Sequence, residues 1–240
     1  MSHISKIPTP IFNTPDIPFN YLPLKKDSQG RLMEIEMIAL PGTKFKCLSK
    51  ISENIFQVET SEYPSTVPLY VDSRFLQAAS AETPEREKIL PTIDKILSWM
   101  EARKGLRYFW GGNWADGIPK ILELYPFLKD ASPEDRDDAI CRGLDCSGIL
   151  YQATNGYTPR NTSDLINFGT EVSTIEHIKP LDLLVWKGHI LIVLSPTTLI
   201  ESRIGHGVVI SPLQQRYLEA VELVKNQNKT LYIRRWHPDS

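Results

Sequence analysis

The residues with the clearest potential for chemistry lie in segment 144–148, which reads LDCSG. A helix predicted to begin near residues 145–146 would place the Cys146 sulfur beside unpaired backbone N–H groups. These groups and the helix macrodipole favour a thiolate, which is a nucleophile for covalent catalysis. The alternative is a buried cysteine that acts as a small apolar residue, the commonest fate of a free cysteine. Cys47 and Cys141 lack the helix setting, and we assign them that structural role.

A nucleophilic cysteine needs a general base, and histidine most often has that role near neutral pH. The chain has five histidines. His3 and His237 lie near the termini, and His177 stands in a polar connection. The pattern leaves His189, at the start of the apolar run ILIVL, and His206, between two glycines in a predicted turn. On pattern alone, His189 is equally well explained as a histidine of the core.

The elements that would hold these residues are a helix and a set of strands. Segment 145–156 predicts a helix that ends at Asn155 and Gly156, a pair that often follows a helix. Five later runs predict strands, at 181–186, 189–194, 198–204, 207–210 and 230–236. A helix that begins with a cysteine, followed by an antiparallel sheet that carries a histidine, is the arrangement of papain-like peptidases.

The first eighty residues predict a separate small domain. Residues 1–23 are rich in proline and predict an extended arm on a surface. Four β-leaning runs separated by turn residues predict a small barrel or sandwich, at 31–40, 43–50, 54–61 and 68–76. Residues 79–84 are the candidate linker. A helix is predicted from Thr83, and Pro91 is either tolerated in it or divides it.

Composition and charge exclude several classes of function. The 27 basic and 29 acidic residues give a formal net charge of −2, which indicates neither a nucleic-acid partner nor a membrane surface. The longest apolar run is far shorter than the roughly 20 residues that span a bilayer. Three irregularly spaced cysteines and an N-terminus without a secretory pattern lead us to expect a cytoplasmic protein with reduced thiols.

Six blocks of the sequence, in order, resemble those of the NlpC-type cell-wall peptidases. They are RYFWGG (107–112), LDCSG (144–148), TPRNTSDL (158–165), LDLLVW (181–186), GHILIVLSPTTLIES (188–202) and GHGVVISPL (205–213). These enzymes are cysteine peptidases of the papain-like superfamily that cut the γ-D-glutamyl–diamino acid bond of peptidoglycan peptides. The earlier strand-rich segment resembles a bacterial SH3-like domain, with Tyr70, Val71 and Leu76 matching its final strand.

The resemblance implies an α+β fold in two domains. An SH3-like β-barrel would occupy 24–80, after the arm at 1–23. A papain-like peptidase domain would occupy 84–238, with the cysteine helix packed on an antiparallel sheet. Between Gly112 and Asp145 the chain has 32 residues (145 − 112 − 1), where the family has a few. We therefore expect an insertion at about 113–143, as a packed excursion, a partner surface or a flap over the cleft.

The implied activity is hydrolysis of short peptidoglycan peptides of the L-Ala–γ-D-Glu–diaminopimelate type, in the turnover or recycling of wall fragments. The implied partner is this small peptide, and the chemistry requires no metal or organic cofactor. Two alternatives stay open. One is an acyltransferase or amidase that uses the same thioester chemistry. The other is a module that binds wall peptides and has lost catalysis.

By position, the resemblance implies that Cys146 is the nucleophile, His189 the general base and Glu201 the third, orienting residue. The family usually has His, Asn or Gln at the third position, although a carboxylate can also orient an imidazole. A tight hairpin at Pro196 and Thr197 would place Glu201 opposite residue 193, about 13 Å along the strand from His189. His206 would lie nearer in that register and remains the alternative third residue.

The resemblance also implies a set of substrate-binding residues, which are Tyr63, Tyr108, Trp110, Asp145, Ser147 and Thr162. Asp145 and Ser147 flank the cysteine and would help to hold the substrate's amine and its D-glutamate. Asp145 is equally predicted to cap the helix. The Tyr108 hydroxyl would assist the oxyanion, or its ring would pack beside Trp110. Thr162 follows Asn161 where the family has Asp-Ser, and Tyr63 corresponds to an SH3-domain tyrosine that closes the substrate's N-terminal side.

Overall fold

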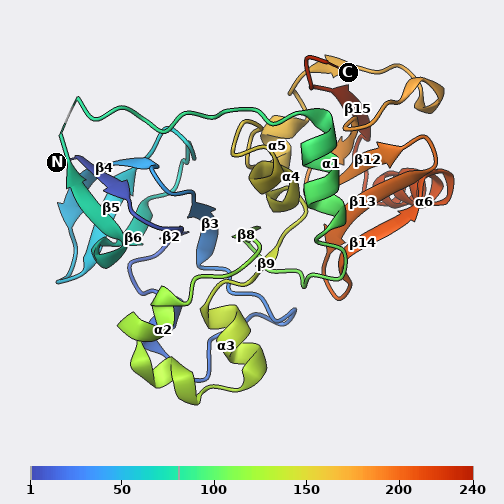
Figure 1. Ribbon diagram of the computed structural model, residues 1–240. Coiled ribbons are helices and arrows are strands. Elements are labelled where there is room, and N and C mark those ends of the chain that lie inside the picture. Colours follow the sequence, from blue (N-terminus) through green and yellow to red (C-terminus); the bar gives the residue numbers. More distant parts are fainter. Residues whose placement is uncertain (1, 81, 240) are drawn as a thin grey trace. The chain divides into compact units, whose positions relative to one another are not determined.

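The computed structural model describes residues 2–80 and 82–239, and the chain divides into two compact units (Figure 1). The first unit is the chain up to Glu87 together with Phe109–Gly143. The second is Lys88–Tyr108 together with the chain from Leu144 onward. The chain therefore leaves the first unit, returns to it and leaves it again. In the part of the chain that the structure describes, no helix is long and apolar enough to cross a membrane.

The first unit contains a seven-stranded antiparallel sheet with the order β3-β2-β6-β5-β4-β1-β7. Its strands are β1 (Ser2–Ser5), β2 (Thr9–Phe12), β3 (Ile35–Ala39), β4 (Lys44–Lys50), β5 (Ile55–Glu59), β6 (Leu69–Asp72) and β7 (Leu76–Ala79), and the 3₁₀ turn η2 (Ser73–Phe75) joins the last two. The four predicted strand runs contain β3, β4, β5 and β6, which confirms them. Over the described residues β3 and β7 end the sheet, and no closed barrel is found. The SH3-like barrel therefore stays a prediction.

The proline-rich N-terminal segment is part of this sheet, so the prediction of a surface arm over 1–23 is wrong. Strand β1 lies between β4 and β7, and β2 lies between β3 and β6. Thr9 and Ile11 are fully buried, and the short 3₁₀ turn η1 (Pro18–Asn20) buries Phe19. The fixed φ of proline suits an extended strand or the start of a 3₁₀ turn as well as an arm, so proline content did not discriminate between them.

The predicted insertion at about 113–143 belongs to the core of the first unit, which corrects its placement in the peptidase domain. It forms β8 (Asn113–Trp114), α2 (Lys120–Leu124), the 3₁₀ turn η3 (Pro126–Asp130) and α3 (Pro133–Ala139). Its buried side chains share one apolar cluster with residues of the sheet and of the segment between β2 and β3. The cluster includes Ile118, Ile121, Tyr125, Leu128, Ala139 and Cys141 from the insertion, and Phe12, Ile17, Phe19, Leu32, Ile35 and Phe75 from the rest of the unit.

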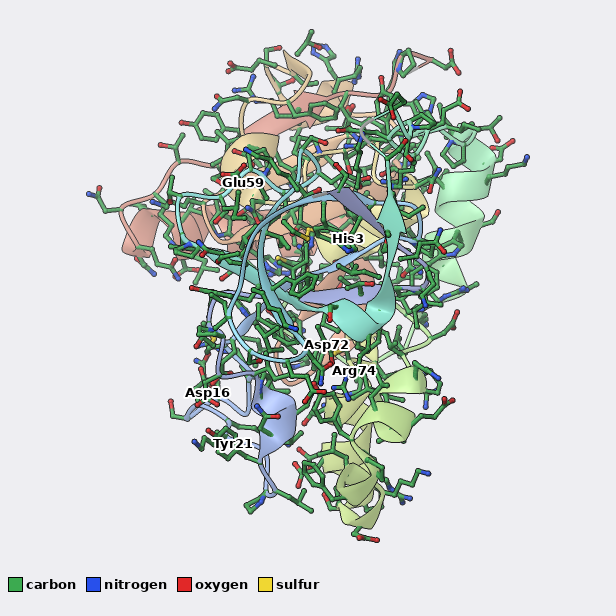
Figure 2. All side chains as sticks on the ribbon, turned by 90° about the vertical axis from the view of Figure 1, so that its left-hand side faces the viewer. His3, Asp16, Tyr21, Glu59, Asp72 and Arg74 are labelled. Carbon is green, nitrogen blue, oxygen red and sulfur yellow. The ribbon has the colours of Figure 1, made fainter. Side chains whose placement is uncertain are left out.

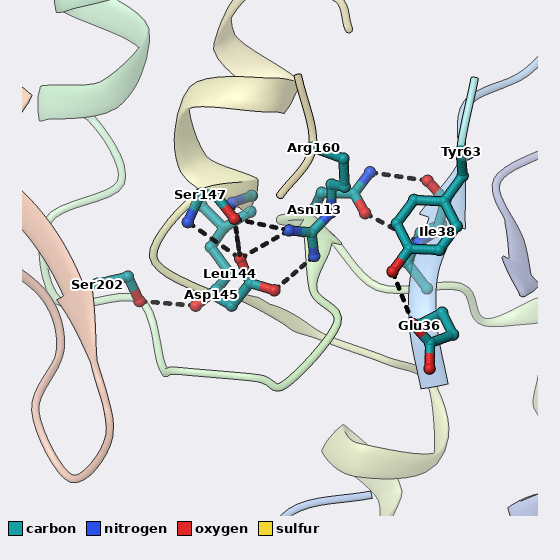
Figure 3. A network of polar contacts seen from close by, with 10 residues as sticks. Glu36, Ile38, Tyr63, Asn113, Leu144, Asp145, Ser147, Arg160 and Ser202 are labelled. Carbon is teal, nitrogen blue, oxygen red and sulfur yellow. Dashed lines mark hydrogen bonds and ion pairs between the residues drawn. The ribbon is translucent and has the colours of Figure 1, made fainter. Parts of the chain in front are cut away.

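Polar contacts fix this segment to the sheet. The buried Asn113 side chain donates to the Ile38 carbonyl at 2.7 Å and accepts from the Ile38 N–H at 2.8 Å (Figure 3). The Tyr125 hydroxyl donates to Asp72 at 2.8 Å, and the Arg74 guanidinium lies 4.7 Å from the Tyr125 ring centre. Asp72 and Arg74 are adjacent in Figure 2 and are joined by an ion pair at 2.6 Å.

The second unit contains a six-stranded antiparallel sheet with the order β10-β15-β11-β12-β13-β14. Its strands are β10 (Thr170–Glu171), β11 (Leu183–Trp186), β12 (His189–Ser195), β13 (Thr198–Arg203), β14 (Gly207–Pro212) and β15 (Tyr232–Arg235). The five predicted strands are confirmed, with boundaries that differ by a few residues. The mixed α+β fold class, with antiparallel sheets, is confirmed as well.

Four α-helices of the second unit accompany this sheet, and they are α1 (Ile93–Glu101), α4 (Gly148–Ala153), α5 (Thr162–Leu165) and α6 (Leu213–Asn226), with a 3₁₀ turn η4 (Ile175–His177). Helix α1 begins ten residues after Thr83, because Pro91 disfavours helical backbone in the residue before it. Helix α6 was not predicted. Its buried residues pack on one face of the sheet against a cluster formed by Leu184, Trp186, Leu191, Val193 and Leu199.

Because segment 109–143 belongs to the core of the first unit, substitutions of two neighbouring residues in it should change the free energy of unfolding by different amounts. Leu128 is fully buried, whereas Phe127 is 41% exposed. Leu128→Ala should lower the free energy of unfolding by about 2–5 kcal/mol, because it removes buried methyl groups and leaves a cavity. Phe127→Ala should change it by no more than about 0.5 kcal/mol. Calorimetry of both variants tests this, and equal stabilities would contradict the assignment of the segment to the core.

Candidate active site

Cys146 lies in the turn between β9 (Gly143–Leu144) and α4, two residues before the helix begins at Gly148. The Asp145 side chain stabilises this turn, because its Oδ1 accepts from the N–H groups of Ser147 at 3.1 Å and Gly148 at 2.7 Å. These are two of the N–H groups that a helix start leaves without partners. The structure thus gives Asp145 the capping role that the sequence predicted.

Arg160 completes a buried polar group around this turn (Figure 3). Its Nη1 donates to Asp145 Oδ1 at 3.1 Å and to Ser147 Oγ at 2.9 Å, and its Nη2 pairs with Asp145 Oδ2. The residues before and after the cysteine are therefore held by one guanidinium. In the sequence, Arg160 stands out only as part of the block TPRNTSDL. Its partner could not be deduced, because fifteen residues separate the two.

The surroundings of Cys146 disfavour a free thiolate. The residue is 9% exposed. Burial, and then the nearby Asp145 carboxylate, raise the pKa of the Cys146 thiol to about 12, against the smaller opposing effects of the Arg160 guanidinium and of the Ser147 and Cys146 N–H groups. The helix start alone therefore does not activate this cysteine, contrary to the sequence argument. Ionisation of Cys146 at neutral pH requires a partner that takes the proton.

His189 and Glu201 are in direct contact. Nε2 of His189, the first residue of β12, lies 2.7 Å from Oε2 of Glu201 on β13. The predicted register was wrong by two residues. The hairpin pairs Ser195 with Thr198, and a bulge between Val193 and Ser195 shifts the register by one further residue, so that Ile200 pairs with Ile192 and not with residue 194. Continued along the strands, this register places Glu201 opposite residue 191, two residues from His189 instead of four. Such diagonal neighbours are about 7–8 Å apart at the backbone, which long side chains can bridge.

Arg216 holds the other side of the Glu201 carboxylate. Its Nε donates to Oε1 at 2.6 Å and its Nη2 donates to Oε2 at 3.0 Å, both from helix α6. Glu201 is fully buried. Burial alone would raise the pKa of Glu201, but hydrogen bonds from His189 and Arg216, together with their charges, lower it to about 2. Arg216 was not among the residues predicted from the sequence. The only signal was indirect, because a glutamate in the apolar run LIES requires a cation from elsewhere.

His206 is not beside His189. It lies exposed in the turn between β13 and β14, and its Nδ1 is 3.2 Å from the Ile204 carbonyl oxygen of the same turn. Of the two candidates for the third residue, Glu201 contacts His189 in the described part of the chain and His206 does not. Within the described residues, however, Cys146 and His189 are not hydrogen-bonded to each other. The link that the structure does provide runs through Ser202, whose Oγ donates to the Leu144 carbonyl at 2.6 Å (Figure 3).

The other predicted binding residues are divided between the two units. In the second unit, Tyr108 forms a parallel bridge with Leu144, and Thr162 Oγ1 accepts from the Gly188 N–H at 3.0 Å, at the turn before His189. In the first unit, the Tyr63 hydroxyl donates to Glu36 at 2.6 Å. Trp110 is also in the first unit, and the Arg31 guanidinium lies over its ring, 5.1 Å from the ring centre.

The remaining cysteines lie in the first unit. Cys141 is fully buried in its apolar cluster, where burial raises the pKa of the thiol. Cys47 is partly buried, with its Sγ 3.1 Å from His3 Nδ1. Over residues 2–80 and 82–239, no three His, Cys, Asp or Glu side chains gather into a group that could hold a metal ion.

Comparison of this structure with known proteins gives one similarity over the full length. A crystal structure of an NlpC/P60 family protein from Bacillus cereus superposes with a TM-score of 0.67, covering 99% of this chain and 100% of the other at 14% identity. The chain has an NlpC/P60-like fold. NlpC2 from Trichomonas vaginalis covers 98% of this chain and 73% of its own at 12% identity, with a TM-score of 0.41.

A third structure covers only part of the chain. RipD from Mycobacterium tuberculosis, described as a non-catalytic NlpC/p60 domain protein adapted to peptidoglycan binding, covers 60% of this chain and 98% of its own. Its identity is 18% and its TM-score 0.41. At the level of sequence, no family model and no curated protein matches this chain. The comparisons therefore establish the fold.

The buried Glu201 carboxylate predicts a specific dependence of stability on pH. Its pKa is about 2 in the folded chain against an ordinary value of 4.5, so it stabilises the fold above pH 4.5 and this contribution disappears as the pH falls toward 2. The difference of 2.5 units (4.5 − 2) corresponds to about 3 kcal/mol. Glu201→Gln should therefore lose less free energy of unfolding than the wild type between pH 5 and pH 2.5.

Urea denaturation across this pH range measures the effect. Glu219→Gln is the matched control, because Glu219 is half-exposed and only approaches Arg216 at 3.5 Å. We expect this control to retain the wild-type pH dependence. If the free energy of unfolding of Glu201→Gln fell with pH as steeply as that of the wild type, this would contradict the account of the buried carboxylate.

Proposed function

We propose that this protein is a cysteine peptidase that hydrolyses the γ-D-glutamyl–diamino acid bond of short peptidoglycan peptides, with Cys146 as nucleophile, His189 as general base and Glu201 as the orienting residue. The observation that carries the proposal is the contact of 2.7 Å between His189 Nε2 and Glu201 Oε2. The NlpC/P60-like fold over 99% of the chain supports the choice of substrate class.

Glu201 contacts Nε2 of His189 and leaves Nδ1 for catalysis. A carboxylate bonded to Nε2 holds the imidazole in one orientation and stabilises its protonated form. In the part of the chain that the structure describes, Nδ1 of His189 has no hydrogen-bond partner, so this atom is available to accept a proton. Trp186, whose ring centre is 5.1 Å from that of His189, restricts the imidazole from a second side.

The proposed reaction begins with transfer of the Cys146 proton to His189 Nδ1. The sulfur then attacks the γ-carbonyl carbon, and the C=O electron pair moves to oxygen. Collapse of this tetrahedral intermediate breaks the C–N bond, and the imidazolium protonates the leaving amine. The product is a thioester on Cys146. Because the thiol has a high pKa in the resting site, the proton transfer to His189 is the step that makes the nucleophile.

Hydrolysis of the thioester repeats these steps with water as the nucleophile. His189 removes a proton from water, the resulting hydroxide attacks the thioester carbon, and the thiolate leaves and regains the proton. The Ser147 and Gly148 N–H groups already donate to Asp145. We therefore assign stabilisation of the oxyanion to a group outside the first helical turn, and the Tyr108 hydroxyl is our candidate.

Asp145 is proposed to bind the free amine of the substrate's first residue. Its Oδ1 is saturated by two backbone N–H groups and by Arg160, whereas Oδ2 receives only the Arg160 Nη2 among the described residues. Oδ2 therefore retains an acceptor site for an ammonium group. Ser147, Thr162, Trp110 and Tyr63 stay predictions as substrate-binding residues.

The assignment of the nucleophile predicts the behaviour of the three cysteines. Cys146→Ala should reduce hydrolysis of L-Ala–γ-D-Glu–diaminopimelate to background, whereas Cys47→Ala should retain most of it. Cys141→Ala should also retain activity in the fraction that folds, since its thiol lies in a core. The measurement is release of the diamino acid. Near-normal turnover by Cys146→Ala would contradict the proposal.

A binding module without catalysis is the second candidate, and the absence of a Cys146–His189 hydrogen bond within the described residues is the observation that favours it. Alkylation by iodoacetamide discriminates between the two. If His189 takes the Cys146 proton, His189→Ala should slow alkylation of Cys146 at pH 7. A binding module would show equal alkylation rates in both proteins and would hydrolyse no peptide.

The proposed role of Asp145 predicts a preference for an unblocked N-terminus. Acetylation of the L-alanine amine removes the positive charge that would pair with Oδ2, so the acetylated tripeptide should have a kcat/KM at least about tenfold lower. Intact polymer, whose alanine is amide-linked, should likewise be a poor substrate. Equal rates on free and acetylated tripeptide would sink this assignment and leave the nucleophile untouched.

A further inference from the structure

Two partners of different kind share the Glu201 carboxylate. His189 Nε2 and Arg216 Nη2 both contact Oε2, at 2.7 Å and 3.0 Å, while Arg216 Nε holds Oε1 at 2.6 Å. The imidazole charge changes near neutral pH, whereas the guanidinium charge is permanent. Because the guanidinium bonds both carboxylate oxygens, it also fixes the orientation of the carboxylate.

Burial decides how these charges must balance. The side chain of Glu201 is fully buried, that of Arg216 is 10% exposed and that of His189 is 17% exposed. A buried carboxylate without a permanent cation would have only a protonated imidazole to compensate it, and would retain a proton on His189. With Arg216 in place, the carboxylate and guanidinium sum to zero in either protonation state of His189.

We infer that Arg216 is a positioning residue of the proposed site: it aligns the Glu201 carboxylate and cancels its charge, so that Glu201 orients His189 without retaining the proton that His189 must give up. The inference rests on the proposed function in one respect, which is that His189 acts as the base. Among the described residues, the hydrogen bonds and ion pairs of Arg216 reach Glu201 and Glu219 and not Cys146 or His189, so Arg216 acts through Glu201.

Other charged groups lie on the elements that carry this trio. Glu219, one turn further along α6, lies 3.5 Å from Arg216 Nη1 and is half-exposed. Arg203 follows Glu201 by two residues on β13 and therefore lies on the same face of that strand. Lys187 is exposed in the turn before His189, and Trp186 adds a ring but no charge. Among the described residues, only Arg216 and His189 contact the Glu201 carboxylate.

Titration of His189 followed by NMR of the full chain tests this inference, with the His189 signal identified as the one missing in His189→Ala. Arg216→Gln should raise the titration midpoint by about one pH unit or more, because an uncompensated carboxylate then contacts the imidazole. Glu201→Gln should lower it, because the guanidinium is left uncompensated. The double variant Glu201→Gln/Arg216→Gln should return it to the wild-type value. His206→Ala is the control and should leave it unchanged.

These outcomes separate charge compensation from a purely structural role of Arg216. A structural role would not move the His189 midpoint up in Arg216→Gln and down in Glu201→Gln. If Arg216→Gln does not fold, Glu201→Gln and the double variant still decide, because neither contains a buried unpaired carboxylate. A wild-type midpoint in Arg216→Gln, or equal midpoints in Glu201→Gln and the double variant, would overturn the inference. The readout is a proton on His189, so a protein that hydrolyses no peptide would refute the proposed function and leave this test valid.

Discussion

A carboxylate that water does not reach organises the second unit. Glu201 is fully buried in β13, and a buried charge of this kind is tolerated only when partners satisfy it. The partners come from two other elements, His189 at the start of β12 and Arg216 on α6. The three side chains meet only because of the strand register, which includes the bulge before Ser195, and because α6 packs on this face of the sheet.

A second buried ion pair organises the segment that carries the cysteine. Arg160 joins Asp145 and Ser147, and the Ser202 hydroxyl, next to Glu201 in sequence, holds the Leu144 carbonyl. Adjacent residues on a strand point to opposite faces, so β13 uses Glu201 on one side and Ser202 on the other. One strand thereby carries the carboxylate that contacts His189 and anchors the chain that leads to Cys146.

The first unit shows how a segment distant in sequence can complete a core. Strands β1 and β2 bring the N-terminus into the sheet, and Phe109–Gly143 adds helices whose apolar faces the sheet needs for burial. The Asn113 side chain bonds both the N–H and the carbonyl of Ile38, and the Tyr125 hydroxyl donates to the Asp72 carboxylate. Length alone made this segment resemble an insertion, whereas its buried side chains make it part of the unit.

The sequence by itself determined what depends on neighbours along the chain. Runs of β-leaning residues predicted four of the seven strands in the first sheet and five of the six in the second. The cap at Asp145 followed from its place before a helix. Residue type and position singled out Cys146, and the resemblance to NlpC-type peptidases added His189 and Glu201. The tertiary structure alone decided the register that brings Glu201 to His189, the pairing of Arg216 and Arg160 with carboxylates fifteen residues away, and the unit to which residues 1–23 and 109–143 belong. The reason is physical: propensity and periodicity report local backbone preference. A bulge or a buried ion pair instead gains its free energy from contacts that exist only once the chain has folded.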